Sequence, residues 1–412
     1  MKILLINKFH YNKGGSETYY FAQAEALRAK GHEVINFAME DKNNITCEQS
    51  KYFVPNVDYN NIDGMKDKIR AVINLFHNKI AAERMERLIQ HEHPDIAHVG
   101  LLHRQITFSV IEVLKRYNIP VVMTMHDLIF ACPNYTMLTN GIVCEKCLKG
   151  SVINCVIGKC VKNSIAKSFL AAIEKVYLMR KNYYNLIDLY ITECEHYKYL
   201  MNLARITKSR IITKSNFLPI QQKYNFNKNY KDYILYFGRF SKEKGLMTLL
   251  QAHKNSDCKR HLVLVGAGPM KQEMEYFVKI NDLVNVEFLG PIYGIEMEKL
   301  IEEAKTIVVP SEWYENCPYA VLQSMAKGKI VIASRIGGLP ELIADGENGF
   351  LFEAKNTLDL ISKVEMVFSM NKEEYENMSE YIMNIAKKKF YWSQYADFLI
   401  DNYIKLLEEK SK

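Results

Sequence analysis

No long hydrophobic run occurs in this sequence of 412 residues. None approaches the ~18 consecutive apolar residues that a membrane-spanning helix needs. The start of the chain has only four apolar residues in succession, Ile3 to Ile6, which is too short for the core of a signal peptide. We therefore expect a cytoplasmic protein without a transmembrane helix, whose contact with a membrane would be peripheral, at the inner face.

A strong charge imbalance is also absent. Lys and Arg number 54 against 47 Asp and Glu, which gives a formal net charge of +7. A nucleic-acid-binding domain usually shows a denser basic stripe within a recognisable module, and neither is found here, so we expect no nucleic-acid partner. Repeats of fixed period and low-complexity tracts are missing too. The mild excess of cations favours a phosphorylated small molecule or an anionic membrane surface.

Cysteine is present nine times, and five of these residues lie between 132 and 160. In a cytoplasmic protein we expect them to be reduced. Cys144 and Cys147, followed by Cys155 and Cys160, form a C-x2-C pair and a C-x4-C pair that could bind one structural zinc ion. Cys132 is a spare ligand in this hypothesis. An iron–sulfur cluster and unconnected thiols are the alternatives.

Short apolar runs alternate with longer amphipathic stretches along most of the chain. This alternation predicts the α/β class, with parallel sheets covered by helices on both faces. The strands expected in the first half are Lys2–Asn7, Glu33–Phe37, Asp95–Val99, Pro120–Thr124, Leu186–Ile191 and Arg210–Lys214. Those expected in the second half are Tyr233–Phe237, His261–Val265, Asn285–Leu289, Thr306–Val309 and Ile330–Ala333.

A polar stretch separates the two series, and a length of 412 residues favours two domains. We predict two Rossmann-like, doubly wound domains that face a cleft. The predicted divisions are an N-terminal domain at 1–218 with a cysteine-rich insertion at 127–163, a linker at 219–231, a C-terminal domain at 232–375, and terminal helices at 376–412 that pack toward the N-terminal domain.

Polar and glycine residues follow the strands of the second half, where ligands bind in open α/β sheets. Arg239 and Lys244 lie on the loop after the first of these strands, and two cations near a helix start suit a diphosphate. A solvated basic loop is the alternative. Gly266 follows the next strand within Gly-Ala-Gly-Pro, which lacks the third glycine of a dinucleotide fingerprint.

The strand at 306–309 leads into the segment 311–323. Glu315 precedes a predicted helix start at Pro318, whose exposed amide groups favour a phosphate. Asn316, Cys317 and Tyr319 complete this turn, and Gln323 follows one helical stretch later.

Between residues 238 and 349 the order of these segments resembles retaining glycosyltransferases of family 4, the glycosyl transferases group 1, which have the GT-B fold. The matching segments are Gly238-Arg239 with Lys244, Val265 to Pro269, Ser311 to Gln323, Gly337 to Glu341, and Asp345 to Gly349.

The resemblance implies a role for each position. Arg239 and Lys244 would bind the diphosphate of a nucleoside-diphosphate-sugar donor, and Glu315 would bind the transferred sugar. The helix amides after Cys317 would support the phosphates. Gln323 stands where the family normally has a second glutamate for the ribose, and glutamine keeps an acceptor but loses the charge. The GT-B resemblance also implies no catalytic metal, and no Asp-x-Asp pair is seen.

The first half offers two further candidates. Gly14 and Gly15 follow the first strand and precede Ser16, a good N-cap, so this loop could face the donor; a simple tight turn is the alternative. His126 follows the strand at 120–124, and the resemblance places a histidine here beside the reacting sugar. A structural histidine is the alternative.

The resemblance implies a hexosyltransferase of surface polysaccharide biosynthesis that acts on a glycan or lipid-linked acceptor. A nicotinamide-dependent oxidoreductase is disfavoured by the missing third glycine. A non-catalytic GT-B scaffold is the alternative that Gln323 favours. The basic helix expected near 164–184 either contacts a membrane surface or packs on the core with a solvated basic face; we favour packing.

Overall fold

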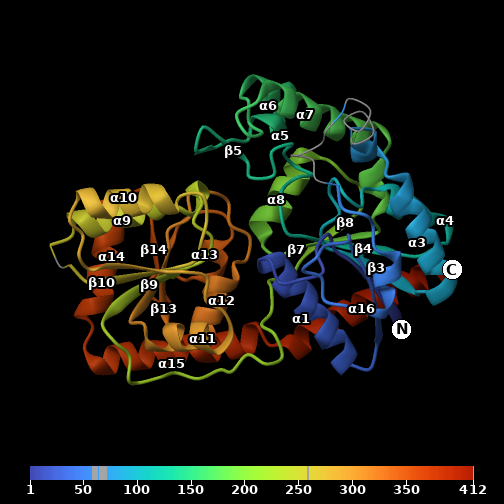
Figure 1. The fold of residues 1–412 in the computed structure, drawn as a ribbon. Coiled ribbons are helices and arrows are strands. Elements are labelled where there is room, and N and C mark those ends of the chain that lie inside the picture. The colour runs from blue at the N-terminus through green and yellow to red at the C-terminus, as the bar shows by residue number, and fades with distance from the viewer. Residues whose placement is uncertain (58–63, 65–71, 258, 412) are drawn as a thin grey trace. The chain divides into compact units, whose positions relative to one another are not determined.

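The computed structural model of the chain describes residues 1–57, 64, 72–257 and 259–411. The chain divides into two compact units (Figure 1). The first unit contains residues 1–136, 145–220 and 392–412, and the second contains residues 137–144 and 221–391.

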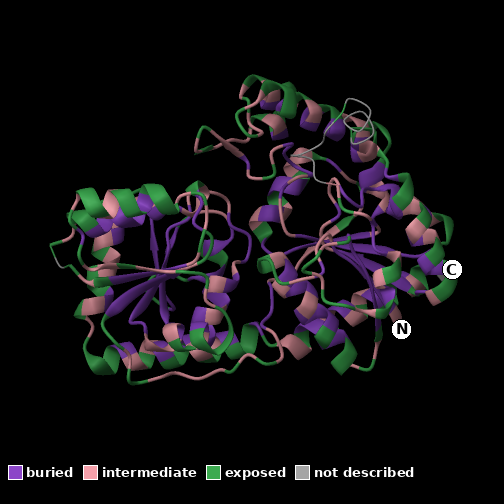
Figure 2. Cartoon of the chain, in the orientation of Figure 1, coloured by how far each residue is buried: buried purple, intermediate pink, exposed green. Residues whose placement is uncertain are grey.

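The first unit is built on a six-stranded sheet with the order β2-β1-β3-β4-β7-β8. Every neighbouring pair runs parallel, so the carboxyl ends of all strands lie at one edge. Most of the strand residues are buried, as expected for a parallel sheet with helices on both faces (Figure 2). The strands are β1 (Lys2–Ile6), β2 (Glu33–Phe37), β3 (Ile96–Val99), β4 (Val121–Met125), β7 (Leu189–Thr192) and β8 (Arg210–Thr213).

The helices of the first unit cover this sheet and carry the cysteine-rich insertion. The C-terminal helix α16 belongs to this unit, where Tyr395 and Tyr403 are buried against α1. The helices are α1 (Gly15–Ala29), α3 (Lys79–Glu92), α4 (Ser109–Arg116), α5 (Lys146–Lys149), α6 (Ile153–Ile157), α7 (Ile165–Arg180), α8 (Glu195–Ala204) and α16 (Trp392–Ser411), with 3-10 turns at Glu48–Tyr52 and Tyr183–Leu186.

The second unit repeats this design with a six-stranded parallel sheet, in the order β11-β10-β9-β12-β13-β14. The central strands are short runs of branched and aromatic residues, which suit a sheet buried on both faces. They are β9 (Tyr233–Phe237), β10 (His261–Val265), β11 (Val286–Leu289), β12 (Thr306–Val309), β13 (Ile330–Ser334) and β14 (Phe350–Phe352).

Helices again cover both faces of this second sheet (Figure 1). They are α9 (Leu246–Asn255), α10 (Lys271–Ile280), α11 (Gly294–Glu303), α12 (Tyr319–Ala326), α13 (Leu339–Leu342), α14 (Thr357–Ser369) and α15 (Lys372–Lys389), with a 3-10 turn at Lys242–Lys244. A two-stranded hairpin of β5 (Leu138–Thr139) and β6 (Ile142–Val143) is grouped with this unit.

The division of the chain differs from the prediction in two places. Of the terminal helices predicted at 376–412, α15 belongs to the second unit, because it packs on α12 and its Tyr375 hydroxyl donates to the carbonyl of Lys305 at 2.5 Å. The predicted insertion at 127–163 is split as well. Its hairpin is grouped with the second unit, where Lys355 donates to the Gly141 carbonyl at 2.8 Å.

Candidate functional site

Four loops meet at the carboxyl edge of the second sheet, and glycines let two of them approach closely. Gly245 has a φ of +68°, and a Cβ there would lie 1.8 Å from the Pro310 carbonyl oxygen. Gly337 has a φ of +60°, and its Cβ would lie 2.5 Å from the Glu315 carbonyl oxygen. Only glycine fits such positions without displacing backbone. The loops after β9 and β13 are therefore held against the loop after β12.

Glu315 lies at the centre of this group. Its Oε1 accepts hydrogen bonds from Lys244 Nζ at 2.6 Å and from Ser311 Oγ at 2.5 Å, and its side chain is only 6% exposed. Burial alone would raise the pKa of Glu315, but the Lys244 ammonium and the two hydrogen bonds outweigh burial and lower it. The result is an ionised, oriented carboxylate that can accept hydrogen bonds from sugar hydroxyls.

Arg239 and Lys244, the two predicted ligands of the diphosphate, both follow β9. Arg239 is exposed and lies next to Gly238. Lys244, by contrast, is held by Glu315 and lies 5.1 Å from the centre of the Trp313 ring. The sequence predicts that Lys244 binds the diphosphate of the donor and that Glu315 binds its sugar. In the structure these two side chains form an ion pair.

Gly266 and Gly268 serve the packing of two loops of the protein. A Cβ at Gly266 would lie 1.9 Å from the Gly238 carbonyl oxygen, and one at Gly268 would lie 2.2 Å from the Phe240 carbonyl oxygen. This contact between the loops after β9 and β10 accounts for both glycines. A role of Gly266 toward a nucleotide stays a prediction.

Helix α12 begins directly after the loop that carries Glu315. Asn316 and Cys317 are buried, Pro318 is the N-cap, and Tyr319 is the first helical residue, one position later than predicted. The amide groups of the first turn of a helix carry a partial positive charge. Gln323 lies one turn further along α12 and is half-buried, so its amide can reach solvent.

The first unit contains a histidine–carboxylate pair at the carboxyl edge of its own sheet. His126 follows β4 and Glu193 follows the neighbouring β7, and His126 Nδ1 lies 2.6 Å from Glu193 Oε1. Burial would lower the pKa of His126, but Glu193 outweighs it, and the pKa is raised. His126 Nε2 is buried and has no hydrogen-bond partner among the described residues. It is therefore the atom of this pair that can serve a ligand.

Polar residues of the β1 loop complete this edge. Glu17 is buried and accepts hydrogen bonds from Ser16 Oγ at 3.0 Å and Asn7 Nδ2 at 3.4 Å. Burial raises the pKa of Glu17. Gly100, at the end of β3, leaves room here: a Cβ would lie 2.9 Å from Asn7 Oδ1 and 3.5 Å from His126 Nε2.

The N-cap of helix α1 differs from the predicted one. Helix α1 starts at Gly15 with Gly14 as its N-cap residue, and Ser16 bonds to Glu17 instead of capping the helix. Gly14 and Gly15 are exposed. Nearby, burial and then repulsion from Lys13 and Arg104 lower the pKa of Lys8 to about 8, which marks a concentration of positive charge beside this loop.

The C-terminal helix positions His126 through an aromatic residue of α1. The ring of Tyr19 lies 4.8 Å from the His126 ring, edge to face. The Tyr19 hydroxyl bonds to Thr124 Oγ1 at 3.0 Å and to the Tyr395 hydroxyl at 2.9 Å. Residues from three distant segments therefore fix the orientation of the imidazole.

The cysteine-rich insertion contains thiols in contact. A hydrogen bond with Cys132 lowers the pKa of Cys147 to about 7, and burial, followed by the charge of Cys160, raises the pKa of Cys155. Cys144 lies at the end of the β5–β6 hairpin, where its N–H donates to the Met137 carbonyl. Across the residues that the structure describes, no group of three or more His, Cys, Asp or Glu is arranged to hold a metal ion.

Zinc binding at Cys144, Cys147, Cys155 and Cys160 thus stays a prediction, and the thiol contacts favour Cys132 over Cys144 as a ligand. Metal analysis of the purified chain should find about one zinc ion per chain. Cys147→Ser should lose it, and comparison of Cys132→Ser with Cys144→Ser identifies the ligand set. Substoichiometric metal in the unmodified chain would contradict the prediction.

Sequence reasoning missed several polar residues of the two edges, namely Asn7, Glu17, Glu193 and Ser311. Glu193 had a usable signal, because an acidic residue directly after a buried strand lies at the ligand edge of a parallel sheet. Glu17 had none, since it is the third residue of an amphipathic helix and such residues are usually solvated.

Two family models match the chain. The model of the glycosyl transferases group 1 matches residues 218–384, and the model of glycosyltransferase family 4 matches residues 13–211.

Curated relatives extend the comparison. An uncharacterized glycosyltransferase of Methanocaldococcus jannaschii is 33% identical over 48% of this chain and 54% of its own length, so this match spans about half of that relative. An uncharacterized 42.6 kDa protein in the cps region of Klebsiella pneumoniae is 24% identical over 88% of this chain and 92% of its own. An α-1,4-N-acetyl-D-galactosaminyltransferase of Campylobacter jejuni, named for an undecaprenol-linked acceptor, is 29% identical over 38% of this chain and 42% of its own.

Solved structures share the fold. Sucrose-phosphate synthase from Thermosynechococcus elongatus gives a TM-score of 0.72 at 18% identity and covers 99% of both chains. Anabaena HepE, in complex with UDP and glucose, gives a TM-score of 0.68 at 16% identity and covers 98% of this chain and 100% of that one. These are GT-B glycosyltransferase structures, and the two parallel-sheet units of this chain have the same fold.

Proposed function

Because the chain belongs to the glycosyltransferases of group 1 and family 4 with the GT-B fold, we propose that it transfers a sugar from a nucleoside-diphosphate-sugar donor to a glycan or lipid-linked acceptor, with retention of the anomeric configuration. The observation that carries this proposal is the ion pair between Lys244 and the buried Glu315 at the carboxyl edge of the second sheet.

The donor binds at this edge through complementary charges. Glu315, ionised and oriented by Lys244 and Ser311, accepts hydrogen bonds from the hydroxyls of the donor sugar. Arg239 and Lys244 neutralise the diphosphate, and the amides that begin α12 add the dipole of the helix. The presence of UDP and glucose in the HepE structure supports a UDP-sugar as the donor.

The acceptor side belongs to the first unit in this proposal. His126 Nε2 binds a hydroxyl of the reacting sugar or of the acceptor, while Glu193 fixes the ring and stabilises a positive charge on it. Stabilisation of transition-state charge by preoriented groups is usually the largest single contribution that an active site makes to the rate. No residue is assigned as a covalent nucleophile.

Surface polysaccharide biosynthesis is the setting that the relatives favour. One relative is named for the cps region of Klebsiella pneumoniae, and another for an undecaprenol-linked glycan acceptor in Campylobacter jejuni. The cations Lys8, Lys13 and Arg104 beside the β1 loop support an acceptor that carries phosphate.

A non-catalytic scaffold is the second candidate, and Gln323 is the observation that favours it. We expect the purified chain to hydrolyse at least one nucleotide-sugar slowly without an acceptor, and Gln323→Glu to retain or raise this rate. Hydrolysis is measured by release of nucleoside diphosphate across a panel of nucleotide-sugars. No turnover by either protein with any donor would favour the scaffold.

A further inference from the structure

Helices α6 and α7 present apolar side chains to solvent. Phe169 is 56% exposed and Ile157 is 74% exposed, although residues of these types are usually buried. In α7, Ile165, Phe169 and Ile173 are four residues apart, so they share one face of the helix. Packing on the core is the interpretation that sequence analysis favours for the basic helix near 164–184, and it is wrong for Ile165 and Phe169, which are exposed.

The opposite side of α7 does pack inward. Its buried residues are Ser168, Ala171, Ala172, Glu174, Lys175 and Leu178. Two of these are charged, and Lys175 donates to the carbonyl of Ala131 in the interior. The helix thus differs from an ordinary amphipathic helix, because part of its charge is inside while Ile165, Phe169 and Ile173 are outside. Figure 2 shows exposed residues along α6 and α7 at the outer edge of this unit.

Basic residues predominate in the stretch of chain that carries these apolar side chains. Between residues 153 and 181 the single acidic residue is Glu174, which is buried. The exposed basic residues of the same stretch are Lys159, Lys162, Lys167, Arg180 and Lys181. The α6–α7 face, defined by Ile153, Ile157, Ile165, Phe169 and Ile173 together with these five cations, therefore carries cations without exposed carboxylates.

We propose that the α6–α7 face binds the surface of an anionic membrane. Apolar side chains between cations match a bilayer, because the cations contact lipid phosphates while the apolar groups enter the acyl boundary. A protein partner would have to bury the apolar side chains and neutralise five cations with carboxylates of its own. This inference rests on the proposed function in one respect, since a lipid-linked acceptor would give the attachment its use.

The mode of contact is peripheral. No helix that the structure describes is long and apolar enough to cross a bilayer. A short helix that lies in the interface binds through its apolar face and through attraction to anionic lipid, and both contributions are measurable separately. Salt weakens the electrostatic part because the cations are exposed.

Vesicle co-sedimentation of the whole chain tests the proposal. Vesicles of phosphatidylcholine are compared with vesicles that hold equal amounts of phosphatidylcholine and phosphatidylglycerol. We expect binding to the anionic vesicles only, with at least a tenfold loss of affinity in Phe169→Asp and in the triple variant Lys159→Glu, Lys162→Glu, Lys167→Glu.

Matched controls come from the second unit. Ile295 is 87% exposed, so Ile295→Asp changes an exposed isoleucine elsewhere. The triple change of Lys271, Lys279 and Lys299 to Glu produces the same change in net charge. Both controls should bind anionic vesicles as the unmodified chain does, and thermal unfolding should show that all variants are folded.

Several results would overturn the proposal. These are equal binding to neutral and anionic vesicles, no binding to either, an equal loss in the control variants, and concentration-dependent self-association that Phe169→Asp abolishes, which would identify a second copy as the partner. Hydrolysis of the nucleotide-sugar donor without lipid should be unchanged in every variant. Absence of that hydrolysis in the unmodified chain would instead count against the proposed function alone.

Discussion

Replacement of Glu315 by alanine is expected to lower kcat/KM for sugar transfer by about 10³-fold, the upper end of the range typical for loss of a preoriented polar group in a buried site. The Glu315 carboxylate is a buried hydrogen-bond acceptor at the carboxyl edge of the second sheet. Its Oε1 also accepts a hydrogen bond from Lys244 Nζ at 2.6 Å and so orients that side chain. Removal of the carboxylate therefore takes away the proposed contact with the sugar and frees a cation of the diphosphate site. Initial rates with purified donor and acceptor measure the effect.

Glu315→Gln is the matched control, because it keeps the shape of the side chain and loses the charge. Lys244 is 23% exposed, so water can partly solvate it once it is unpaired, and we expect a cost of about 1–3 kcal/mol in unfolding free energy at pH 7. The lowered pKa of Glu315 means that its contribution is present above its ordinary pKa and is lost as pH falls through the folded value. The difference in unfolding free energy between the unmodified chain and Glu315→Gln should therefore shrink as the pH is lowered. Full transfer activity in Glu315→Ala would refute the placement of the sugar.

Replacement of His126 by alanine is expected to lower kcat by about 10²- to 10³-fold. The imidazole is fixed by Glu193 and by the Tyr19 ring, and its Nε2 is buried without a partner among the described residues. Initial rates again provide the measurement. His253→Gln is the control, because His253 is also buried but belongs to neither sheet edge.

The raised pKa of His126 gives this prediction a pH signature. A group whose pKa is raised on folding stabilises the fold fully below its ordinary value of about 6.5, and this stabilisation is lost as pH rises through the folded value. Thermal unfolding should therefore show a larger advantage of the unmodified chain over Glu193→Gln at pH 5.5 than at pH 8.5. Unchanged activity in His126→Ala would mean that the pair is structural, and a stability advantage that grows with pH would contradict the raised pKa of His126.

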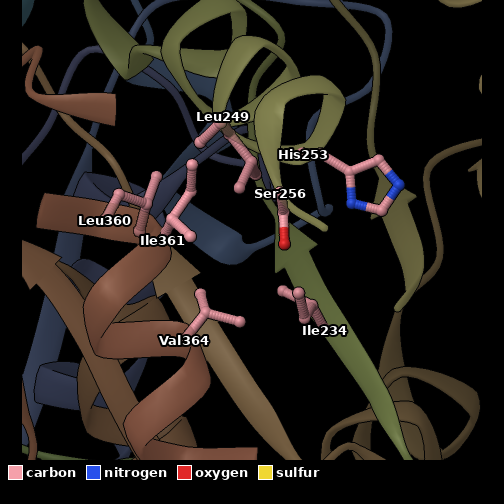
Figure 3. A pocket seen from close by; sticks show the side chains of 8 residues that line it. Ile234, Leu249, His253, Ser256, Leu360, Ile361 and Val364 are labelled. Atoms are coloured by element: carbon pink, nitrogen blue, oxygen red, sulfur yellow. The ribbon is translucent and has the colours of Figure 1, made fainter. Parts of the chain in front are cut away.

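The small cavity in the second unit is a weaker candidate for a ligand site. Figure 3 shows Leu249, Leu360, Ile361 and Val364 around a common space, with the His253 ring turned away from it. The lining is aliphatic apart from His253 and Ser256 and includes none of the predicted site residues. It offers no group that could bind a diphosphate, so the function is assigned to the sheet edge.

Most of the strands could be predicted from the sequence because they are short branched runs that end in glycine, proline or polar residues. Tyr233–Phe237, His261–Val265 and Thr306–Val309 occur with the predicted bounds. Phe350–Phe352 was missed, since three residues give too little periodicity to recognise. The β5–β6 hairpin was missed because its strands have two residues each, and such a hairpin depends on tertiary contacts.

The residues of the candidate site were named one by one from the sequence, but their arrangement was not predicted. Motif order indicated Lys244 and Glu315 separately, while their ion pair joins loops 71 positions apart and depends on glycines that let those loops touch. Glu193 was missed for a related reason. The strand before it was predicted at 186–191 instead of Leu189–Thr192, and its partner His126 lies 67 positions away. The exposure of Ile165, Phe169 and Ile173 in α7 reflects tertiary packing, which sequence periodicity cannot report.

The central claim is that the carboxyl edge of the second sheet binds the donor diphosphate and leaves Glu315 for the sugar. A crystal structure of the chain with a bound nucleoside-diphosphate-sugar tests it most directly. We expect phosphate oxygens at about 3 Å from Arg239, Lys244 and the first amides of α12, with a sugar hydroxyl on Glu315. Phosphates bound away from these groups would contradict the account.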